Sequence, residues 1–216
     1  MIILPRDHFS WNQLQTWEKD KELYKAIYFN EDESKKFKPN RGMKKGKQMA
    51  DSLESGEASG DILLDAVIQN LPKFEIMDKV FYAELPIGKD KIKLHIQPDT
   101  YEKDLSKYYE YKTGQIGYDA KGEKKTAWNQ AKANKHGQMD FYDTGIYLIT
   151  KKIPDHWLVE VETEKVDPTN KWSKLEATGH VNIYHTVRTT AQILKMMARI
   201  TKAIKEISKE YEEFLY

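Results

Sequence analysis

Apolar side chains recur every three or four residues in five parts of the chain, which is the spacing of one face of a helix. The predicted helices cover about residues 11–28, 42–55, 62–71, 126–149 with a break at Gly137, and from Thr186 to the end. Ser10 with Gln13 forms a capping-box pattern before the first helix, and Asp61 can cap the third. The last helix is amphipathic, and its apolar stripe consists of Ile193, Met196, Met197, Ile200, Ile204, Ile207 and Tyr211.

Between these helices the pattern changes to the short apolar runs and alternation of strands. Segments 74–87 and 91–99 surround the turn residues Gly88, Lys89 and Asp90 and predict a hairpin. Further strands are expected at YYEYKTG (108–114), HWLVEVE (156–162) and GHVNIYH (179–185). The order of helices, three strands, helix, two strands and helix predicts one α/β domain over residues 1–216. This domain would have a mixed β-sheet flanked by helices and a long C-terminal helix.

The composition narrows the classes of protein. Charged residues make up 32% of the chain and apolar residues 39%, so a polar surface can still enclose a core. The absence of cysteine excludes disulfides, thiolate zinc sites and iron–sulfur clusters. No apolar run approaches the roughly 20 residues of a membrane helix, and the opening MIILPRDHF is too short for a signal sequence. We therefore expect a cytoplasmic protein with no membrane partner.

The net charge of +1 hides two basic segments. Residues 34–49 contain seven Lys or Arg and no acidic residue, and residues 121–136 are also rich in lysine. Such segments suggest a surface that faces a polyanion, although a solvated lysine-rich face is the alternative for each alone. The residues expected to contact a nucleic acid are Lys44, Lys45, Lys47, Lys124, Lys125 and Trp128.

Asp99, Glu110 and Lys112 are the charged residues with the most specific arrangement. Asp99 ends one predicted strand, while Glu110 and Lys112 stand two apart in the next and therefore project from the same face. Two adjacent carboxylates repel unless they are protonated or bridged by a cation, and Mg²⁺ prefers oxygen ligands. A nearby lysine can orient a water molecule or stabilise charge on a phosphoryl oxygen. A solvent-facing ion pair is the alternative interpretation.

The sequence Pro98-Asp99, followed by Glu110-Tyr111-Lys112, resembles the motif of the PD-(D/E)XK nucleases, in particular their RecB-like and phage-type exonuclease branch. The resemblance implies a restriction-endonuclease-like core. It also implies that Asp99, Glu110 and the Tyr111 backbone carbonyl bind Mg²⁺ or Mn²⁺, while Lys112 serves the attacking water.

Two further segments resemble this branch, and one position departs from it. Gln138 and Tyr142 match its Gln-x-x-x-Tyr helix, where they would bind the substrate or order the site, and residues 9–28 are similar to its N-terminal helix. However, Ala50 stands where the branch usually carries another metal ligand. The acidic residues considered as substitutes are Glu54, Asp51 and Glu84.

Together these features predict a Mg²⁺- or Mn²⁺-dependent DNA nuclease, an exonuclease according to the branch it resembles. The family further implies phage or mobile-element recombination or repair, a separate helicase or recombination protein as a partner, and a homo-oligomer. Ala50 motivates a rival prediction, a catalytically inactive DNA-binding or scaffold protein with a nuclease fold. A protein-interaction domain is a third alternative.

Overall fold

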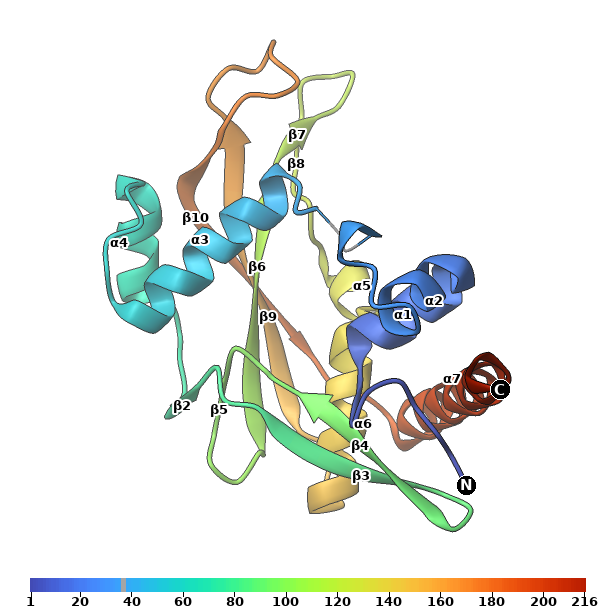
Figure 1. Cartoon of the computed structure of the whole chain (residues 1–216). Helices are drawn as coiled ribbons and strands as arrows, with labels where there is room; N and C mark the ends of the chain where they lie inside the picture. Colours follow the sequence, from blue (N-terminus) through green and yellow to red (C-terminus); the bar gives the residue numbers. More distant parts are fainter. Residues whose placement is uncertain (36–37) are drawn as a thin grey trace.

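A computed structural model describes residues 1–35 and 38–216, so Lys36 and Phe37 of the predicted basic segment lie outside the described residues. Its largest sheet consists of β2 (Ile76–Met77), β5 (Thr100–Tyr101), β6 (Lys107–Gln115), β9 (Asp155–Lys165) and β10 (Leu175–Thr186). The strand order is β10-β9-β6-β5-β2, with β6 parallel to β9 and the other neighbouring pairs antiparallel. The sheet is therefore mixed, as predicted (Figure 1).

A second, smaller sheet contains the predicted hairpin. It consists of β1 (Phe9–Ser10), β4 (Asp90–Ile96) and β3 (Phe81–Ile87), in that order. Gly88 adopts a φ of +63° in the hairpin turn, a conformation that favours glycine. The predicted continuous strand over 74–87 is wrong, because Asp78 has a φ of +46° and separates β2 from β3.

The N-terminal helical region consists of two helices, α1 (Trp11–Lys19) and α2 (Lys21–Tyr28), rather than the single helix predicted. Ser10 caps α1 as predicted, because its side chain accepts a hydrogen bond from the Gln13 amide. The break lies at Asp20, whose backbone is extended and whose side chain accepts a hydrogen bond from the Leu23 amide. The first helix ends there because Asp20 adopts the extended backbone of an N-cap and starts a new helix. A short 3-10 turn, η1 (Glu33–Lys35), follows.

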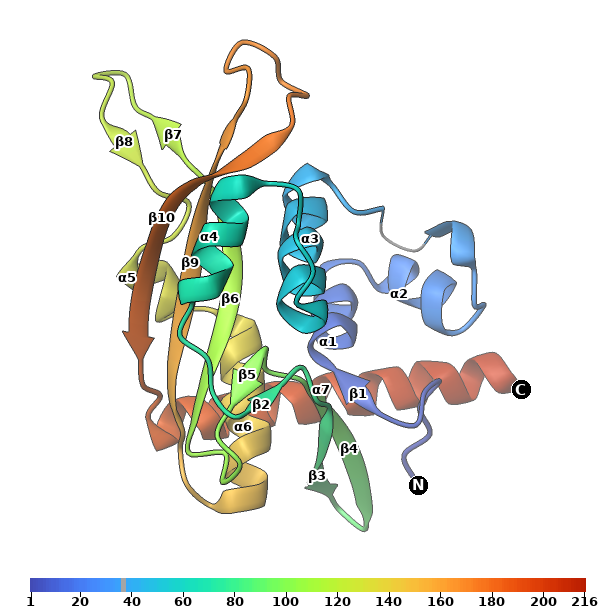
Figure 2. The same cartoon turned by 90° about the vertical axis from the view of Figure 1, so that its left-hand side faces the viewer.

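One face of the large sheet is covered by α3 (Arg41–Ser55) and α4 (Ile62–Asn70) (Figure 2). Asp61 caps α4 as expected by accepting from the Leu64 amide at 3.1 Å. The helices and the sheet share a buried cluster made of Met49, Leu64, Val67, Leu71, Tyr111, Val159, Val161 and Ala177. This apolar contact fixes α3 beside β6.

The opposite face is covered by α5 (Gln130–Ala133) and α6 (Gly137–Thr150), with α7 (Thr190–Leu215) packed against α6 (Figures 1 and 2). The predicted break at Gly137 is confirmed, since α6 begins there. The helix predicted from Thr126 begins later, after an unpredicted hairpin of β7 (Gly117–Tyr118) and β8 (Lys124–Lys125).

The C-terminal helix begins at Thr190, because Thr186 still pairs within β10 and Thr189 forms a capping box with Gln192. Its predicted stripe faces the core: five of the seven side chains are buried, and Met197 and Tyr211 are partly buried. Among the described residues, no helix is long and apolar enough to cross a membrane.

Candidate active site

Strand β6 carries two charged residues of the predicted motif on one face. Glu110 is 1% exposed, and Lys112 Nζ lies 2.5 Å from Glu110 Oε1. The side chain of Lys112 is 25% exposed, so part of it reaches the surface while its ammonium group contacts the buried carboxylate. The alternation of the strand therefore brings Glu110 and Lys112 together as predicted.

Asp99 lies just before β5 and meets the same strand from its edge. Its Oδ2 accepts a hydrogen bond from the Tyr111 amide at 2.6 Å. β5 pairs with β6 only through Thr100–Tyr109 and Tyr101–Tyr108. Beyond Tyr109 this edge of β6 is not paired with β5, and the Asp99 side chain bonds to it instead. The amide and carbonyl of one strand residue face the same edge, so the Tyr111 carbonyl also points toward Asp99.

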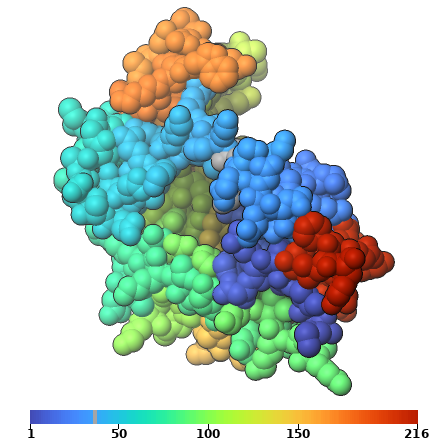
Figure 3. Space-filling model, viewed as in Figure 1, coloured from blue at the N-terminus to red at the C-terminus, as the bar shows by residue number. Residues whose placement is uncertain are grey.

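A cavity of about 480 Å³ opens beside this group and is lined by Asp99, Tyr111, Lys112 and one side of α3. In the space-filling view the surface is hollowed between α3, the N-terminal helices and the β3–β4 region (Figure 3). Asp99 and Lys112 can therefore be reached from outside the molecule, whereas Glu110 is buried behind them.

Helix α3 contributes a line of residues four apart to this cavity: Gly42, Gly46, Ala50 and Glu54. The helix lies close to β6 here, since a Cβ at Gly46 would be in ordinary contact with Thr113 Oγ1 at 3.6 Å, and Thr113 Oγ1 donates to the Gly42 carbonyl at 3.3 Å. Ala50 therefore lies on the side of α3 that faces the cavity, and its methyl group has no oxygen that could bind a metal. Glu54, one turn further on, lines the same cavity.

The other two substitute acids point elsewhere. Asp51 forms an exposed ion pair with Lys47 at 2.9 Å and lines a separate groove on the outer side of α3. Glu84 pairs with Lys91 at 2.8 Å on the surface of the β3–β4 hairpin. Neither residue lines the cavity, so these two suggestions do not fit the structure.

Asp78 is an acidic residue of the cavity that sequence reasoning missed. It lines the cavity, its amide donates to the Asp99 carbonyl at 3.0 Å, and its Oδ1 accepts from the Gln97 side chain at 2.8 Å. In the sequence, Asp78 is visible only as a charged residue within the run IMDKVF. The prediction of one continuous strand over 74–87 gave no reason to place it in the site.

The ionisation of the site follows from its burial. Burial, reinforced by the nearby Asp99 charge, raises the pKa of Glu110 to about 8, and burial also raises the pKa of Asp99. Burial alone would lower the pKa of Lys112, but the carboxylates of Glu110 and Asp99 outweigh it and raise that pKa. The lysine therefore stays charged while the two acids compete for a proton or a cation.

The donor set fits a hard divalent ion. Glu110 Oε2 is buried and lacks a hydrogen-bond partner in the described part of the chain, and such an oxygen requires a proton or a cation. No cluster of three or more Asp, Glu, His or Cys side chains within residues 1–35 and 38–216 is arranged to hold a metal. Asp99, Glu110 and the Tyr111 carbonyl would therefore share an ion with water or substrate oxygens.

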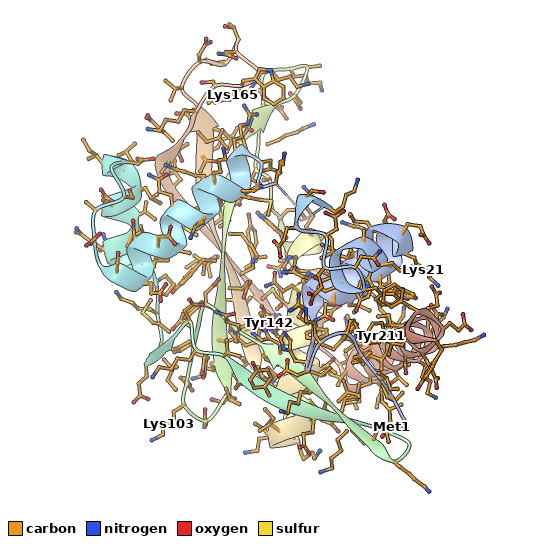
Figure 4. The ribbon with its side chains drawn as sticks, viewed as in Figure 1. Met1, Lys21, Lys103, Tyr142, Lys165 and Tyr211 are labelled. Atoms are coloured by element: carbon orange, nitrogen blue, oxygen red, sulfur yellow. The ribbon has the colours of Figure 1, made fainter. Side chains whose placement is uncertain are left out.

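Gln138 and Tyr142 form the predicted pair on α6, with Gln138 Nε2 donating to Tyr142 Oη at 2.8 Å. Tyr142 is only 7% exposed and lies in the middle of the molecule (Figure 4). Burial, with the nearby Glu110 charge, raises the pKa of Tyr142. Neither residue lines the cavity, so their geometry supports ordering of the site rather than direct contact with a substrate.

The predicted phosphate-binding lysines differ in their exposure. Lys45 is buried at 4% exposure and pairs with Asp61 at 2.5 Å, so its expected role at the surface is wrong. Lys44 and Lys47 are exposed on α3, and Lys47 lines the cavity. Lys124 and Lys125 are exposed on β8, where Lys124 pairs with Glu162 at 2.6 Å.

Trp128 is held by a buried carboxylate that the sequence did not reveal. Its amide donates to Glu160 Oε1 at 3.1 Å, and its half-buried ring packs against His136 with centroids 5.0 Å apart. Glu160 is fully buried beside β6, where Gly114 leaves room for its carboxylate. Trp128 therefore has a structural role in addition to any contact with a ligand.

Neither a protein-family model nor a curated protein matches the sequence. A solved structure of a candidate exonuclease from Eubacterium rectale matches 96% of this chain and 82% of its own, with a TM-score of 0.57 at 9% identity. The chain therefore shares the fold of this structure, which agrees with the fold expected from the resemblance to the PD-(D/E)XK nucleases. A phage-related exonuclease from Haemophilus somnus 129PT matches over 90% of this chain and 81% of its own, at 12% identity and a TM-score of 0.49.

Proposed function

We propose that this protein is a Mg²⁺- or Mn²⁺-dependent nuclease that hydrolyses phosphodiester bonds of DNA. The observation that carries the proposal is that Asp99 and Lys112 line one open cavity beside Glu110, whose buried Oε2 lacks a partner among the described residues. The exonuclease fold supports it, and exonuclease rather than endonuclease action is part of the proposal.

Each residue has a role that follows from its surroundings. Asp99, Glu110 and the Tyr111 carbonyl would hold the ion, which when bound supplies a polarised water and neutralises phosphate charge. Lys112 remains protonated beside Glu110, so it can orient the attacking water and stabilise charge on the phosphoryl oxygens. Gln138 supports Tyr142 behind Glu110.

Exposed lysines of α3 and β8 would bind the phosphate backbone. Lys44 and Lys47 lie on α3, and Lys124 and Lys125 lie on β8, while Lys45 is withdrawn by its ion pair with Asp61. Affinity for DNA should then fall steeply as salt increases. A cytoplasmic role in recombination or repair, beside a separate helicase or as a homo-oligomer, extends this proposal.

The proposal is tested by incubating the purified chain with linear and circular, single- and double-stranded DNA in Mg²⁺, Mn²⁺ or EDTA. Wild type should degrade linear DNA only with metal, and Asp99→Asn or Lys112→Ala should lower the rate at least about 100-fold, the scale of losing an electrostatic catalytic group. Asp51→Asn is the matched control, since Asp51 lies outside the cavity. Cleavage that survives both active-site substitutions would refute the assignment.

A catalytically inactive DNA-binding protein is the second candidate, and Ala50 favours it. Ala50 is exposed on the cavity wall, so Ala50→Glu can add a carboxylate without displacing a buried side chain. If the wild-type chain binds DNA without cutting it, and Ala50→Glu gains metal-dependent cleavage, the second candidate is correct. Cleavage by the wild type would exclude it.

A further inference from the structure

Two loops at one end of the large sheet carry strongly exposed aromatic side chains. Tyr118, in the β7–β8 hairpin, is 65% exposed, and Trp172, in the β9–β10 loop, is 81% exposed. Both loops rise from the same end of the molecule in two perpendicular views (Figures 1 and 2). Tryptophan and tyrosine usually bury much of their large apolar surface, so this exposure indicates a surface available to a ligand.

The exposure of Trp172 does not result from a loose backbone. The Trp172 amide donates to Asn170 Oδ1 at 2.8 Å, and the Asp167 amide donates to Ser173 Oγ at 2.8 Å. The Val166 amide closes the loop on the Lys174 carbonyl at 3.1 Å. The loop is therefore fixed by its own hydrogen bonds while it holds the indole ring in solvent.

Arg41 connects this loop to the wall of the cavity. It is the first residue of α3, and its guanidinium donates to the carbonyls of Lys171 and Ser173 and to Gln115 Oε1. The next residue of α3, Gly42, lines the cavity that contains Asp99. The hydrogen bonds of Arg41 therefore connect the Trp172 loop to the rim of the candidate site.

The charges around the two rings favour an anionic ligand with flat apolar groups. Lys171 Nζ lies 5.4 Å from the Trp172 ring centroid, which places a cation beside an aromatic face. Lys121 is exposed in the loop of the β7–β8 hairpin, where Tyr118 is also exposed. An aromatic face can stack on a base while the adjacent ammonium binds its phosphate.

We propose that Trp172 and Tyr118 form a stacking surface for unpaired bases of a single-stranded nucleic acid leading to the cavity. The inference deepens the proposed nuclease function and rests on it for the identity of the ligand. Single strands are favoured over duplexes because the bases of a duplex already stack on one another, whereas those of a single strand are free to stack on an aromatic side chain.

The test measures binding of a fluorescent 20-nucleotide thymidine oligomer in EDTA by anisotropy. Trp172→Ala should weaken binding about 10-fold, which corresponds to about 1.4 kcal/mol. Adding Tyr118→Ala in a double variant should weaken binding further. Tyr216→Ala is the matched control, because Tyr216 is a fully exposed aromatic at the end of the chain. The oligomer should also quench a component of tryptophan fluorescence that Trp172→Ala removes.

Four outcomes separate the inference from its alternatives. Unchanged affinity in both aromatic variants, with DNA cleavage intact, overturns the stacking surface but leaves the nuclease proposal. Quenching and weakened binding in a protein that never cleaves DNA support the surface and refute the nuclease. An equal loss for single strands and duplexes contradicts recognition of unpaired bases. A wild-type dimer that Trp172→Ala converts to a monomer identifies a contact between copies and overturns the proposal.

Discussion

At the scale of single residues, burial decides what each charged side chain can do. Lys45 and Lys47 are two apart in the same basic segment, yet Lys45 pairs with Asp61 in the interior while Lys47 lies on the surface. Burial raises the pKa of Asp61, but its hydrogen bonds with Lys45 and two backbone amides outweigh this and hold that pKa below its usual value. Two lysines of one basic segment thus form a buried ion pair in one case and an exposed ion pair in the other.

Glu110 gives a pH-dependent prediction at this scale. With its pKa raised to about 8, the carboxyl is mostly protonated at pH 6, so Mn²⁺ must displace a proton. Binding measured by calorimetry should tighten about tenfold per pH unit between pH 6 and 7 and level off above about pH 8. Glu110→Gln should remove most of this dependence, and Asp51→Asn should keep it. An affinity that stays flat from pH 6 to 8 would contradict the buried acid as a ligand.

At the scale of elements, close approaches between α3, β6 and β9 create the site. Thr113 of β6 donates to the Gly42 carbonyl of α3, and Gly114 lets the Glu160 carboxylate lie beside β6. Gly114 is the last residue of the predicted strand YYEYKTG and is visible in the sequence. The reason for a glycine at this position is not visible there, because it depends on which side chain of the neighbouring strand lies opposite.

Gly114→Ala is therefore expected to destabilise the protein by about 1–3 kcal/mol, the usual effect of overpacking. The new Cβ would lie 2.0 Å from Glu160 Oε1, and Glu160 cannot turn away without losing the Trp128 amide. Urea unfolding measures the change. Gly117→Ala is the control, since no heavy atom of the described neighbours lies within 4 Å of its Cβ. Equal effects of the two substitutions would contradict the close approach.

At the scale of the whole molecule, the fold collects the site from distant parts of the chain. Asp99 follows the small sheet, Glu110 and Lys112 belong to the large one, and the opposing wall is α3. Helix α7 packs against α6 and α1, and Arg199 of α7 pairs with Glu18 of α1. The C-terminal helix therefore joins the N-terminal helices to the helix behind the site.

Shortening a buried side chain of α7 should weaken the whole fold. Ile200 is fully buried, so Ile200→Ala is expected to lower the free energy of unfolding by about 2–5 kcal/mol. Leu194, 55% exposed on the same helix, provides the control, and Leu194→Ala should change stability by less than about 0.5 kcal/mol. Both values come from urea titrations. A similar loss in both variants would contradict burial of the stripe as the cause, since alanine is a better helix former than either leucine or isoleucine.

The sequence alone determined the features that depend on neighbours along the chain. These include the capping of α1 and α4, the apolar stripe of α7, the β3–β4 hairpin and the shared face of Glu110 and Lys112. Each follows from the period of a helix or a strand or from a local hydrogen bond. The resemblance of residues 98–112 to the PD-(D/E)XK motif also implied the type of fold that the chain shares with the solved exonuclease structure.

Only the tertiary structure decided the contacts between distant segments. It placed Asp78 on the cavity wall, buried Lys45, turned Asp51 away and left Glu54 beside Ala50. These outcomes depend on which side chains face one another after packing. A linear pattern sets the direction of a side chain only within its own helix or strand, whereas solvent exposure and charge partners come from the other elements.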